Sequence, residues 1–436
     1  MKSFFFSYIF FCLSFFSQIQ YGYAGIIETL NKDEVQTIQY NDCTYKKNIR
    51  TVQLQAPDFG LSQPIINLNS SETLILGFDD LDAELQNYSY TFIHCNANWE
   101  PSDLMSSEFI DGFADNSINE YHFSTNTLQK YIHYNARFPN NSTRFTKSGN
   151  YILKVYLDDD ANDLVLTRRF MIQDNRINIA GEVHAASIIS DRNYKQEIDF
   201  TIEHEGYAIQ NPYIDLKVFI IQNNHWSNVK SGLKPVYVKG QQLVYDFDEQ
   251  NVFPGVNEFR NFDIKNIRYL SQHIAKIQTD TLINHVYLFP DEKRAFKQYF
   301  SQPDINGNFL IKIDEGKNSE TDADYCYVSF FLPYDAGSID GNLYIFGAFN
   351  GWKCTPENQM HYNPKRMAYE CILYLKQGYY NYEYILKDDK QEIDETFIEG
   401  SHAVTENDYS ILVYHRFPGT FYDQLIGVKR LNSMRD

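Results

Sequence analysis

The sequence is poor in cysteine, in basic residues and in the short motifs that mark catalysis. Six of its 436 residues are cysteine, and none stands in a Cys-x-x-Cys pair, which argues against a zinc ribbon or a thioredoxin-type redox site. It has 38 lysines and arginines against 57 acidic residues, so the basic patches that bind nucleic acid are not expected. It also lacks a Gly-x-Ser-x-Gly elbow, a phosphate loop and His-x-x-x-His spacing on a helix. We therefore expect no enzyme, no catalytic residue, no cofactor, no small-molecule substrate and no nucleic-acid partner.

Long amphipathic helices, internal repeats and low-complexity segments are missing as well. Aromatic side chains are abundant instead, with 34 tyrosines and 33 phenylalanines. Many stand in short runs that alternate with polar residues: Glu197–Glu203 alternates Ile198, Phe200 and Ile202 with polar neighbours, the period of a half-buried strand. Turn signals separate such runs about every ten residues. The pattern predicts an all-β chain of three consecutive β-sandwich units, immunoglobulin-like or early-set-like.

The first residues are typical of a secretory signal peptide. Lys2 supplies the positive start, Ser3–Phe16 gives an apolar core, and Gly22–Ala24 offers small residues for cleavage, which we expect after Ala24. The apolar core is shorter than the ~20 residues that span a bilayer. Cleavage leaves a charge of −19 − 1 = −20, because one lysine and no acid are removed.

Five cysteines follow the predicted cleavage site, and an odd number leaves at least one free thiol. They are Cys43, Cys95, Cys326, Cys354 and Cys371. A bridge between Cys354 and Cys371 is compatible with an oxidising compartment, but spacing alone does not establish it.

Polar breaks between strand-like runs divide the chain, the clearest at Asp174–Arg176. Asp79–Asp82 is predicted to be an acidic turn inside the first region. The predicted divisions are a signal peptide (1–24), an N-terminal β domain (25–173), a middle β-sandwich (174–318), a C-terminal early-set-like β-sandwich (319–416) and a loosely structured tail (417–436).

Two acidic stretches invite a calcium interpretation. Asp304, Asn306, Asn308 and Glu315 have the spacing of a calcium loop, but Phe309 occupies the position where that loop requires glycine. The Asn-Gly step favours a hairpin turn there. The second stretch comprises Asp158, Asp159, Asp160 and Asp163, for which a solvated turn between strands is favoured over a metal site. We expect no metal centre at either stretch.

Two further groups have a structural and a functional interpretation. His94 and Cys95 are adjacent, so in a strand they point to opposite faces and cannot share a proton; a buried histidine and a small apolar cysteine are expected. Glu258–Arg260 is either a contact site or an internal ion pair, with Phe259 and Phe262 as core residues. The structural role is favoured for both groups.

Seven segments stand in a specific order along the chain. They are His94–Ser102, Asn126–Tyr134, Ser148–Tyr151, Gln222–Trp226, Pro254–Asp263, Asp304–Phe309 and Gly347–Trp352. Between roughly Val52 and Tyr414 the chain thereby resembles the plug protein of the bacterial type IX secretion system, formerly a domain of unknown function. Asn96 and Asn98 replace expected acids, and Val256 replaces an expected glycine. Val286–Pro290 and Asp304–Phe309 resemble the closing hairpin of the family's second region.

The resemblance implies a non-enzymatic periplasmic protein. Such plugs bind the periplasmic end of a giant outer-membrane β-barrel translocon and occlude its pore when no cargo-receiving partner is bound. The resemblance does not show which residues make the contact. A secreted cargo protein of the same system would need a C-terminal sorting domain, which 417–436 does not resemble.

A glycan-binding exported protein is the alternative. Gly347–Trp352 resembles the start of the sugar site in glycogen-binding and starch-enzyme early-set modules, and Gly378–Tyr384 resembles their next strands. Those modules add a lysine and a second tryptophan, whose places fall on Glu383 and near Lys390 here. A lost stacking platform and a reversed charge favour the fold without its sugar site.

Overall fold

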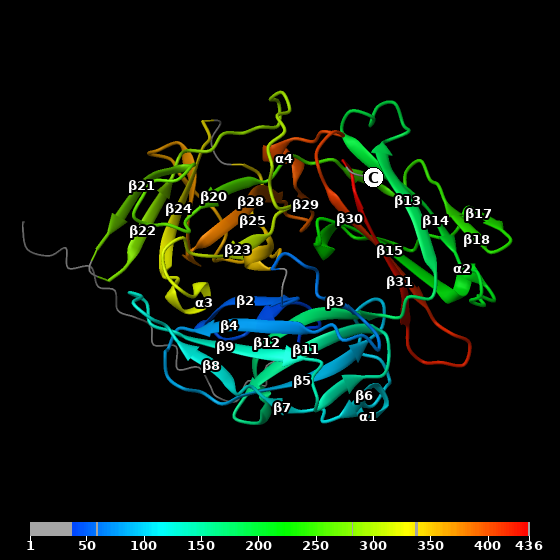
Figure 1. Cartoon of the computed structure of the whole chain (residues 1–436). Coiled ribbons are helices and arrows are strands. Elements are labelled where there is room, and N and C mark those ends of the chain that lie inside the picture. Colours follow the sequence, from blue (N-terminus) through cyan, green and yellow to red (C-terminus); the bar gives the residue numbers. More distant parts are fainter. Residues whose placement is uncertain (1–36, 58–59, 281, 336–338, 435–436) are drawn as a thin grey trace, which may run out of the picture. The chain divides into compact units, whose positions relative to one another are not determined.

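The computed structural model describes residues 37–57, 60–280, 282–335 and 339–434. The predicted signal peptide and its cleavage after Ala24 lie outside these residues. Strands make up 46% and helices 6% of the chain, which confirms a mostly β fold with many antiparallel sheets (Figure 1). The described helices are single turns: α1 (Ser106–Phe109), α2 (Pro212–Asp215), α3 (Ser319–Asp322), α4 (Thr396–Glu399), and the 3-10 turns η1 (Trp226–Asn228) and η2 (Ala348–Asn350).

The first pair of sheets holds the strands up to Gln173. One sheet runs in the order β1 (Cys43–Thr44), β12 (Asp160–Gln173), β11 (Gly149–Leu157), β5 (Tyr88–Cys95), β7 (Asn116–Ser117), with β3 (Ile65–Asn67) parallel to β12. The other runs β2 (Ile49–Gln55), β4 (Leu74–Asp80), β9 (Ile132–Phe138), β8 (Glu120–Phe123). A small ribbon joins β10 (Thr143–Phe145) to β6 (Ile110–Gly112). Tyr90 and Phe92 of β5 share one buried cluster with Phe78 of β4, so side chains at every second position of β5 enter the core.

The second pair of sheets contains both middle and C-terminal strands. One sheet runs β13 (Asn178–Ala185), β14 (Lys195–Glu203), β18 (Gln242–Tyr245), β17 (Tyr237–Lys239), with β19 (Val252–Pro254) on β14. The other runs β16 (Lys230–Ser231), β15 (Leu216–Gln222), β30 (Asp408–His415), β31 (Gln424–Asn432). Figure 1 shows β30 and β31 in red beside the green strand β15. Phe200 of β14 and Val218 of β15 belong to the core cluster that the two sheets share.

The third pair of sheets is inserted between β19 and β30. In one sheet β28 (Gly378–Lys387) pairs with β20 (Arg260–Asp263), β23 (Phe309–Ile311), β25 (Asn342–Phe346) and β29 (Ile393–Asp394). The other runs β21 (Ile274–Thr279), β22 (Asn284–Leu288), β24 (Tyr325–Pro333), β27 (Ala368–Lys376), β26 (His361–Asn363), and β22 and β24 are parallel. Phe262 of β20 and Phe330 of β24 share its core.

Strand pairing corrects the predicted order of the regions. The predicted boundary at 318/319 separates strands that pair, since β20 and β23 lie before it and β28 beyond it. The predicted third region includes β30, which pairs with β15 of the second. The second and third pairs of sheets are therefore not consecutive along the chain. Alternation identifies a strand locally, but it does not specify a partner that lies nearly 200 residues away.

The prediction that residues 417–436 form a loosely structured tail is also wrong. Within it, β31 pairs with β30 along its length, and Leu425, Ile426 and Leu431 are buried. Lys429 and Arg430 hid this strand in the sequence, because they interrupt its apolar alternation.

Of the predicted acidic turn Asp79–Asp82, Leu81 and Asp82 do form a turn, whereas Asp79 and Asp80 are the end of a strand. Asp79 and Asp80 belong to β4 and are fully buried. Asp79 accepts hydrogen bonds from Lys376 at 2.7 Å and from Tyr325 at 2.6 Å. Burial alone would raise the pKa of Asp79, but Lys376 and His133 lower it below its usual value. This buried pair ties the first pair of sheets to the third.

The predicted closing hairpin does not form as such. Asn306 and Gly307 do make a turn, with φ of 50° and 73°. The strand after it, β23, pairs with β28, whereas β22 before it pairs with β21 and β24. The turn chemistry was therefore predicted correctly, and the strand partners were not.

Candidate functional site

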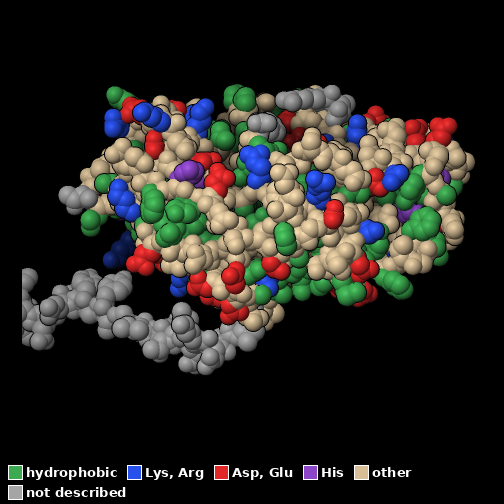
Figure 2. Space-filling view, turned by 60° about the horizontal axis from the view of Figure 1, so that its bottom comes forward, with side chains coloured by type: hydrophobic (Ala, Val, Ile, Leu, Met, Phe, Trp, Pro, Cys, Tyr) green, Lys and Arg blue, Asp and Glu red, His purple; other side chains and the backbone are tan. Residues whose placement is uncertain are grey.

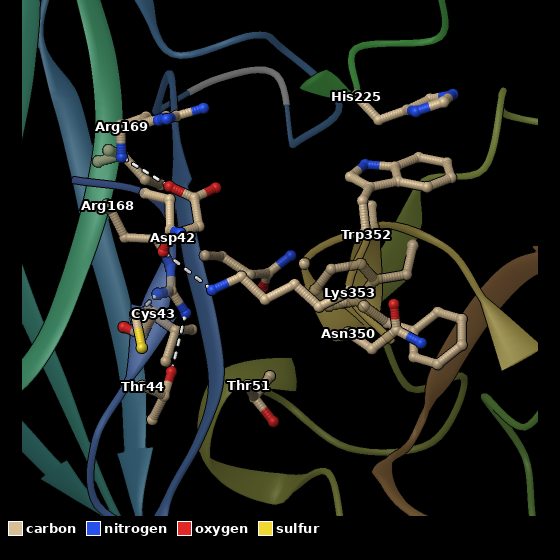
Figure 3. A pocket seen from close by; sticks show the side chains of 18 of the residues that line it. Asp42, Cys43, Thr44, Thr51, Arg168, Arg169, His225, Asn350, Trp352 and Lys353 are labelled. Atoms are coloured by element: carbon tan, nitrogen blue, oxygen red, sulfur yellow. Dashed lines mark hydrogen bonds between the residues drawn. The ribbon is translucent and has the colours of Figure 1, made fainter. Parts of the chain in front are cut away.

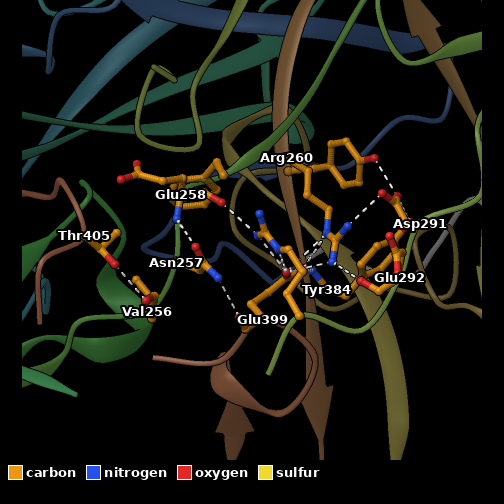
Figure 4. Close-up of polar contacts among 12 residues, drawn as sticks. Val256, Asn257, Glu258, Arg260, Asp291, Glu292, Tyr384, Glu399 and Thr405 are labelled. Atoms are coloured by element: carbon orange, nitrogen blue, oxygen red, sulfur yellow. Dashed lines mark hydrogen bonds and ion pairs between the residues drawn. The ribbon is translucent and has the colours of Figure 1, made fainter. Parts of the chain in front are cut away.

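Arg260 is the centre of a buried network in the third pair of sheets (Figure 4). Its guanidinium group donates to Glu399 at 2.9 Å, to Asp291 at 2.8 Å and to the carbonyl of Glu292 at 2.7 Å. Arg294 donates to the same Glu399 at 2.7 Å. We call Arg260, Arg294, Asp291 and Glu399 the Arg260 hub. Its ion pair does not involve Glu258, the neighbour considered in the sequence.

Charge pairing sets the electrostatics of the hub. Glu399 is 1% exposed, and burial by itself would raise its pKa. Arg260 and Arg294 outweigh that effect and lower the pKa to about 2. The carboxylates in turn raise the pKa of Arg260 against the effect of its own burial. Every charge in the hub is thus compensated, which is the condition for a stable buried ion network.

The segment before Arg260 has an unusual backbone conformation and is closely packed. Val256, where the family resemblance predicts glycine, has φ of 47°, a conformation that a β-branched residue rarely adopts. A Cβ on Gly255 would lie 2.1 Å from the carbonyl oxygen of His402, so that position requires glycine. Phe259 and Phe262 are 3% and 0% exposed, as predicted for core residues.

The hub anchors the connection between β22 and β23, residues 289–308, which we call the anchored loop. Asp291 also accepts from the hydroxyl groups of Tyr382 and Tyr384 at 2.7 and 2.6 Å. Tyr299 donates to the carboxylate of Glu258. Residues 289–308 contain neither helix nor strand, so these side chains fix their course. Connections of this length are usually functional when they are ordered.

The anchored loop presents apolar side chains to solvent. Phe296 is 93% exposed, Phe300 77% and Phe289 58%. The face of the molecule in Figure 2 intersperses acidic and basic side chains with scattered hydrophobic ones, so charge of neither sign covers it. Exposed aromatic side chains on an anchored backbone are the usual core of a protein interface.

A cavity of about 950 Å³ lies where the three pairs of sheets meet (Figure 3). All three tryptophans of the chain line it: Trp99, Trp226 and Trp352. Trp99 and Trp226 meet edge to face, with ring centres 5.2 Å apart. The guanidinium carbon of Arg169 lies 4.3 Å from the ring centre of Trp99. No local sequence signal joins these residues, since they are far apart in the chain.

Three cationic side chains, Arg168, Arg169 and Lys353, enter this cavity from β12 and from the turn after η2 (Figure 3). We call them the cation cluster. Arg168 donates to the carbonyl of Cys43 at 2.9 Å, and Arg169 to that of Tyr40 at 2.8 Å. Lys353 reaches Asn41 Oδ1 at 3.0 Å. Within the described part of the chain, none of the three forms an ion pair with a carboxylate.

Trp352 does not offer the open platform of a sugar site. Its ring is stacked on His225 at 4.6 Å and meets Phe346 edge to face at 5.3 Å. Glu383, at the place of the early-set lysine, is 3% exposed, and burial raises its pKa far above the usual value. Lys390 is exposed. The geometry gives the glycan-binding alternative no support.

The two predicted turns have the geometry of turns. Asp304 accepts from the backbone of Asn306 at 2.7 Å, while Glu315 pairs with Arg268 at 2.8 Å, so the four residues of the apparent calcium loop do not converge. Asp158 and Asp159 have φ of 49° and 59° between β11 and β12. Asp163 pairs with Lys46 at 2.7 Å.

Two other groups among the described residues have ligand atoms close enough for a metal ion. They are His184 with Glu197 and Asp199, and Glu258 with Asp304 and Glu406. Sequence reasoning missed both. In the second group burial raises the pKa of Asp304 to about 7, so protonation relieves its charge. His184 already bonds Asp199 at 2.9 Å.

His94 and Cys95 are buried on opposite faces of β5, as predicted. His94 contacts Ser102 Oγ at 2.8 Å, and burial lowers its pKa to about 4. Cys95 lies in a separate apolar cluster, and burial raises its pKa to about 12. Neither is prepared for nucleophilic chemistry. All five cysteines of the described residues are free thiols, including Cys354 and Cys371.

The fold places the chain in the class of mostly β proteins, and none of its described helices is long and apolar enough to cross a membrane. Residues 49–174 match the family model of the Type 9 secretion system plug protein 1st domain, and the chain belongs to this family. The family is structural and non-catalytic, and membership implies a plug role in type IX secretion.

A solved structure supports the fold along most of the chain. The crystal structure of a hypothetical protein from Parabacteroides merdae ATCC 43184 is 30% identical, with a TM-score of 0.88. The match covers 91% of this chain and 100% of that one. No curated protein matches the chain.

Proposed function

We propose that this chain is a periplasmic plug. It binds the periplasmic end of the outer-membrane β-barrel translocon of the type IX secretion system and occludes the pore when no cargo-receiving partner is bound. The match of residues 49–174 to the plug first domain is the observation that carries this proposal. The mature chain then resides in the periplasm, against the inner face of the outer membrane.

The anchored loop is our candidate for the docking element. A plug needs affinity for a protein surface, and side chains such as Phe296 and Phe300 bury well in a partner's pocket. The Arg260 hub holds the backbone that carries them, so little order has to be gained on binding. Translocon residues at the periplasmic mouth are the expected occupant of this surface.

The three pairs of sheets are best interpreted as three β-sandwich units. Support comes from the core clusters, each of which draws buried side chains from both sheets of one pair. The N-terminal unit then ends near residue 173, and the third unit is an insertion in the second between β19 and β30.

Affinity capture from solubilised outer membranes tests the docking proposal. The tagged wild-type chain is expected to recover one very large barrel protein without its cargo-receiving partner. The Phe296→Ser/Phe300→Ser variant should recover much less of it, since two apolar anchors are removed from the interface.

Phe421→Ser is the matched control, because Phe421 is 73% exposed but lies outside the anchored loop. This variant should recover as much barrel as the wild type. Equal recovery by all three proteins would remove the anchored loop from the proposal but leave the plug role standing. If the wild type recovers no barrel at all, the plug role itself is wrong.

A further inference from the structure

The cation cluster brings like charges together in one cavity. Burial lowers the pKa of Lys353. Cys43 and Asp42 act against that effect, whereas the positive charges of Arg168 and Arg169 add to it.

Asp42 and Glu357 are the carboxylates of the cavity lining. Glu357 pairs with Arg50 at 2.9 Å, whereas Asp42 Oδ1 accepts from the backbone N–H of Arg169 at 2.6 Å. The other cations of the lining are Lys46, Arg50 and Lys376, which form ion pairs, and Lys47, which is exposed. The three cations of the cluster therefore stand against Asp42 alone, a local excess of two positive charges in a chain whose net charge is −19. Such an arrangement is stabilised when an anion is bound.

Donors of the cavity lining also remain unused. Arg169 donates through Nε and Nη2, whereas its Nη1 has no hydrogen-bond acceptor among the described residues. Arg50 Nε and Trp99 Nε1 are buried without a hydrogen-bond partner in the described chain, and both residues line the cavity. Buried donors normally have partners, so a ligand or ordered water belongs near them.

The size and lining of the cavity bear on the class of ligand. A volume of about 950 Å³ is at the upper end of small-molecule sites, so an inorganic ion would fill only a small part of it. Trp226 and Trp352 are half-buried and contribute apolar surface to the remainder. The local charge excess matches a dianion better than a single carboxylate.

We propose that this cavity binds a phosphate monoester whose attached group lies against the tryptophan-lined part. Arg168, Arg169 and Lys353 contact the phosphoryl oxygens, because guanidinium forks and an ammonium group suit such oxygens. Arg168 and Arg169 belong to β12 and Lys353 to the turn after η2, so the bound anion joins the first pair of sheets to the third. The site is independent of the plug role and of the anchored loop.

Calorimetric titration and thermal unfolding of the full mature chain test this site. Glucose 6-phosphate is the soluble probe, glucose is its uncharged counterpart, and phosphatidylcholine vesicles with or without phosphatidic acid represent a lipid headgroup. We expect glucose 6-phosphate or the phosphatidic acid vesicles to bind and to raise the unfolding temperature, with glucose and plain vesicles inactive. Binding of the vesicles alone assigns the phosphate to a lipid, and binding of the sugar phosphate alone assigns it to a soluble ester.

Three variants keep the test specific. Lys353→Met should weaken binding by roughly tenfold or more, as expected for a lost charge-assisted contact. Lys353→Arg should bind well, and Lys390→Met, which changes the net charge equally outside the cavity, should bind like the wild type. The proposal is overturned if neither phosphate probe binds, if glucose binds equally well, or if Lys353→Met and Lys390→Met behave alike.

Discussion

The Arg260 hub and the cation cluster hold positive charge in opposite ways. In the hub, carboxylate oxygens lie 2.7 to 2.9 Å from the guanidinium nitrogens, and the pKa of Glu399 falls to about 2. In the cation cluster, the side chains donate to neutral oxygens, and burial lowers the pKa of Arg169 to about 10. A network of fully paired charges stabilises the fold, whereas cations without an ion pair can bind an anionic ligand.

The largest effect should come from breaking the hub. Arg260→Met leaves Glu399 and Asp291 with one cationic partner fewer in a buried site, so we expect a loss of about 3–5 kcal/mol in the free energy of unfolding. Chemical denaturation measures it. Adding Glu399→Gln should restore part of the loss, because the stranded charge is then removed. An Arg260→Met protein as stable as the wild type would mean that the hub is not structural.

The stability at low pH should distinguish the Arg260 hub from the cation cluster. The pKa of Glu399 is about 2 in the folded chain and near 4.5 when unfolded, so its contribution is fully present above pH 4.5 and lost as the pH falls toward 2. The shift corresponds to roughly 3 kcal/mol. Unfolding measured across this range should show a smaller loss in Arg260→Met than in the wild type. Lys353→Met should follow the wild-type curve, and a flattened curve in that variant would contradict the distinction.

A smaller change is expected from the cation cluster in the absence of ligand. Lys353→Met removes one hydrogen bond and one unpaired charge, so unfolding should shift by less than about 1 kcal/mol. Lys390→Met, at an exposed position, controls for the change in net charge. A loss as large as that of Arg260→Met would show that Lys353 has a structural role like that of Arg260.

The smallest change in stability should follow from Phe296→Ser/Phe300→Ser. Both side chains are exposed, so the free energy of unfolding should stay within about 0.5 kcal/mol per substitution. Chemical denaturation of the same variant measures this free energy. If it is unchanged, any loss of binding in the capture experiment results from the interface. A strongly destabilised double variant would instead place these phenylalanines in the scaffold.

The sequence predicts the positions of strands well, but it does not predict which strands pair. The predicted strand Glu197–Glu203 lies within β14 (Lys195–Glu203), because alternation is a local signal. The partners β15 and β30 are nearly 200 residues apart, and nothing in either segment encodes that pairing. The sequence predicts a turn at Asp79, because no nearby residue could compensate a buried carboxylate. The lysine that does so, Lys376, belongs to a distant strand.

For the candidate sites too, the sequence indicates local segments but not their distant partners. The sequence points to Glu258–Arg260 as a contact site or an internal ion pair, and to Val256 as the replacement of an expected glycine. It does not reveal Glu399 as the partner of Arg260. The cavity beside the cation cluster left one trace in the sequence: the three tryptophans that line it all lie in segments of the predicted family resemblance. Their shared cavity emerges only when distant segments meet.

The plug role is tested most directly by ion conductance. The purified barrel translocon, without its cargo-receiving partner, is incorporated into a planar lipid bilayer, and the mature chain is added to the periplasmic side. The current should fall when the chain is added and recover when it is washed out, with no effect from the opposite side. A chain that binds the barrel and leaves the current unchanged would contradict occlusion of the pore.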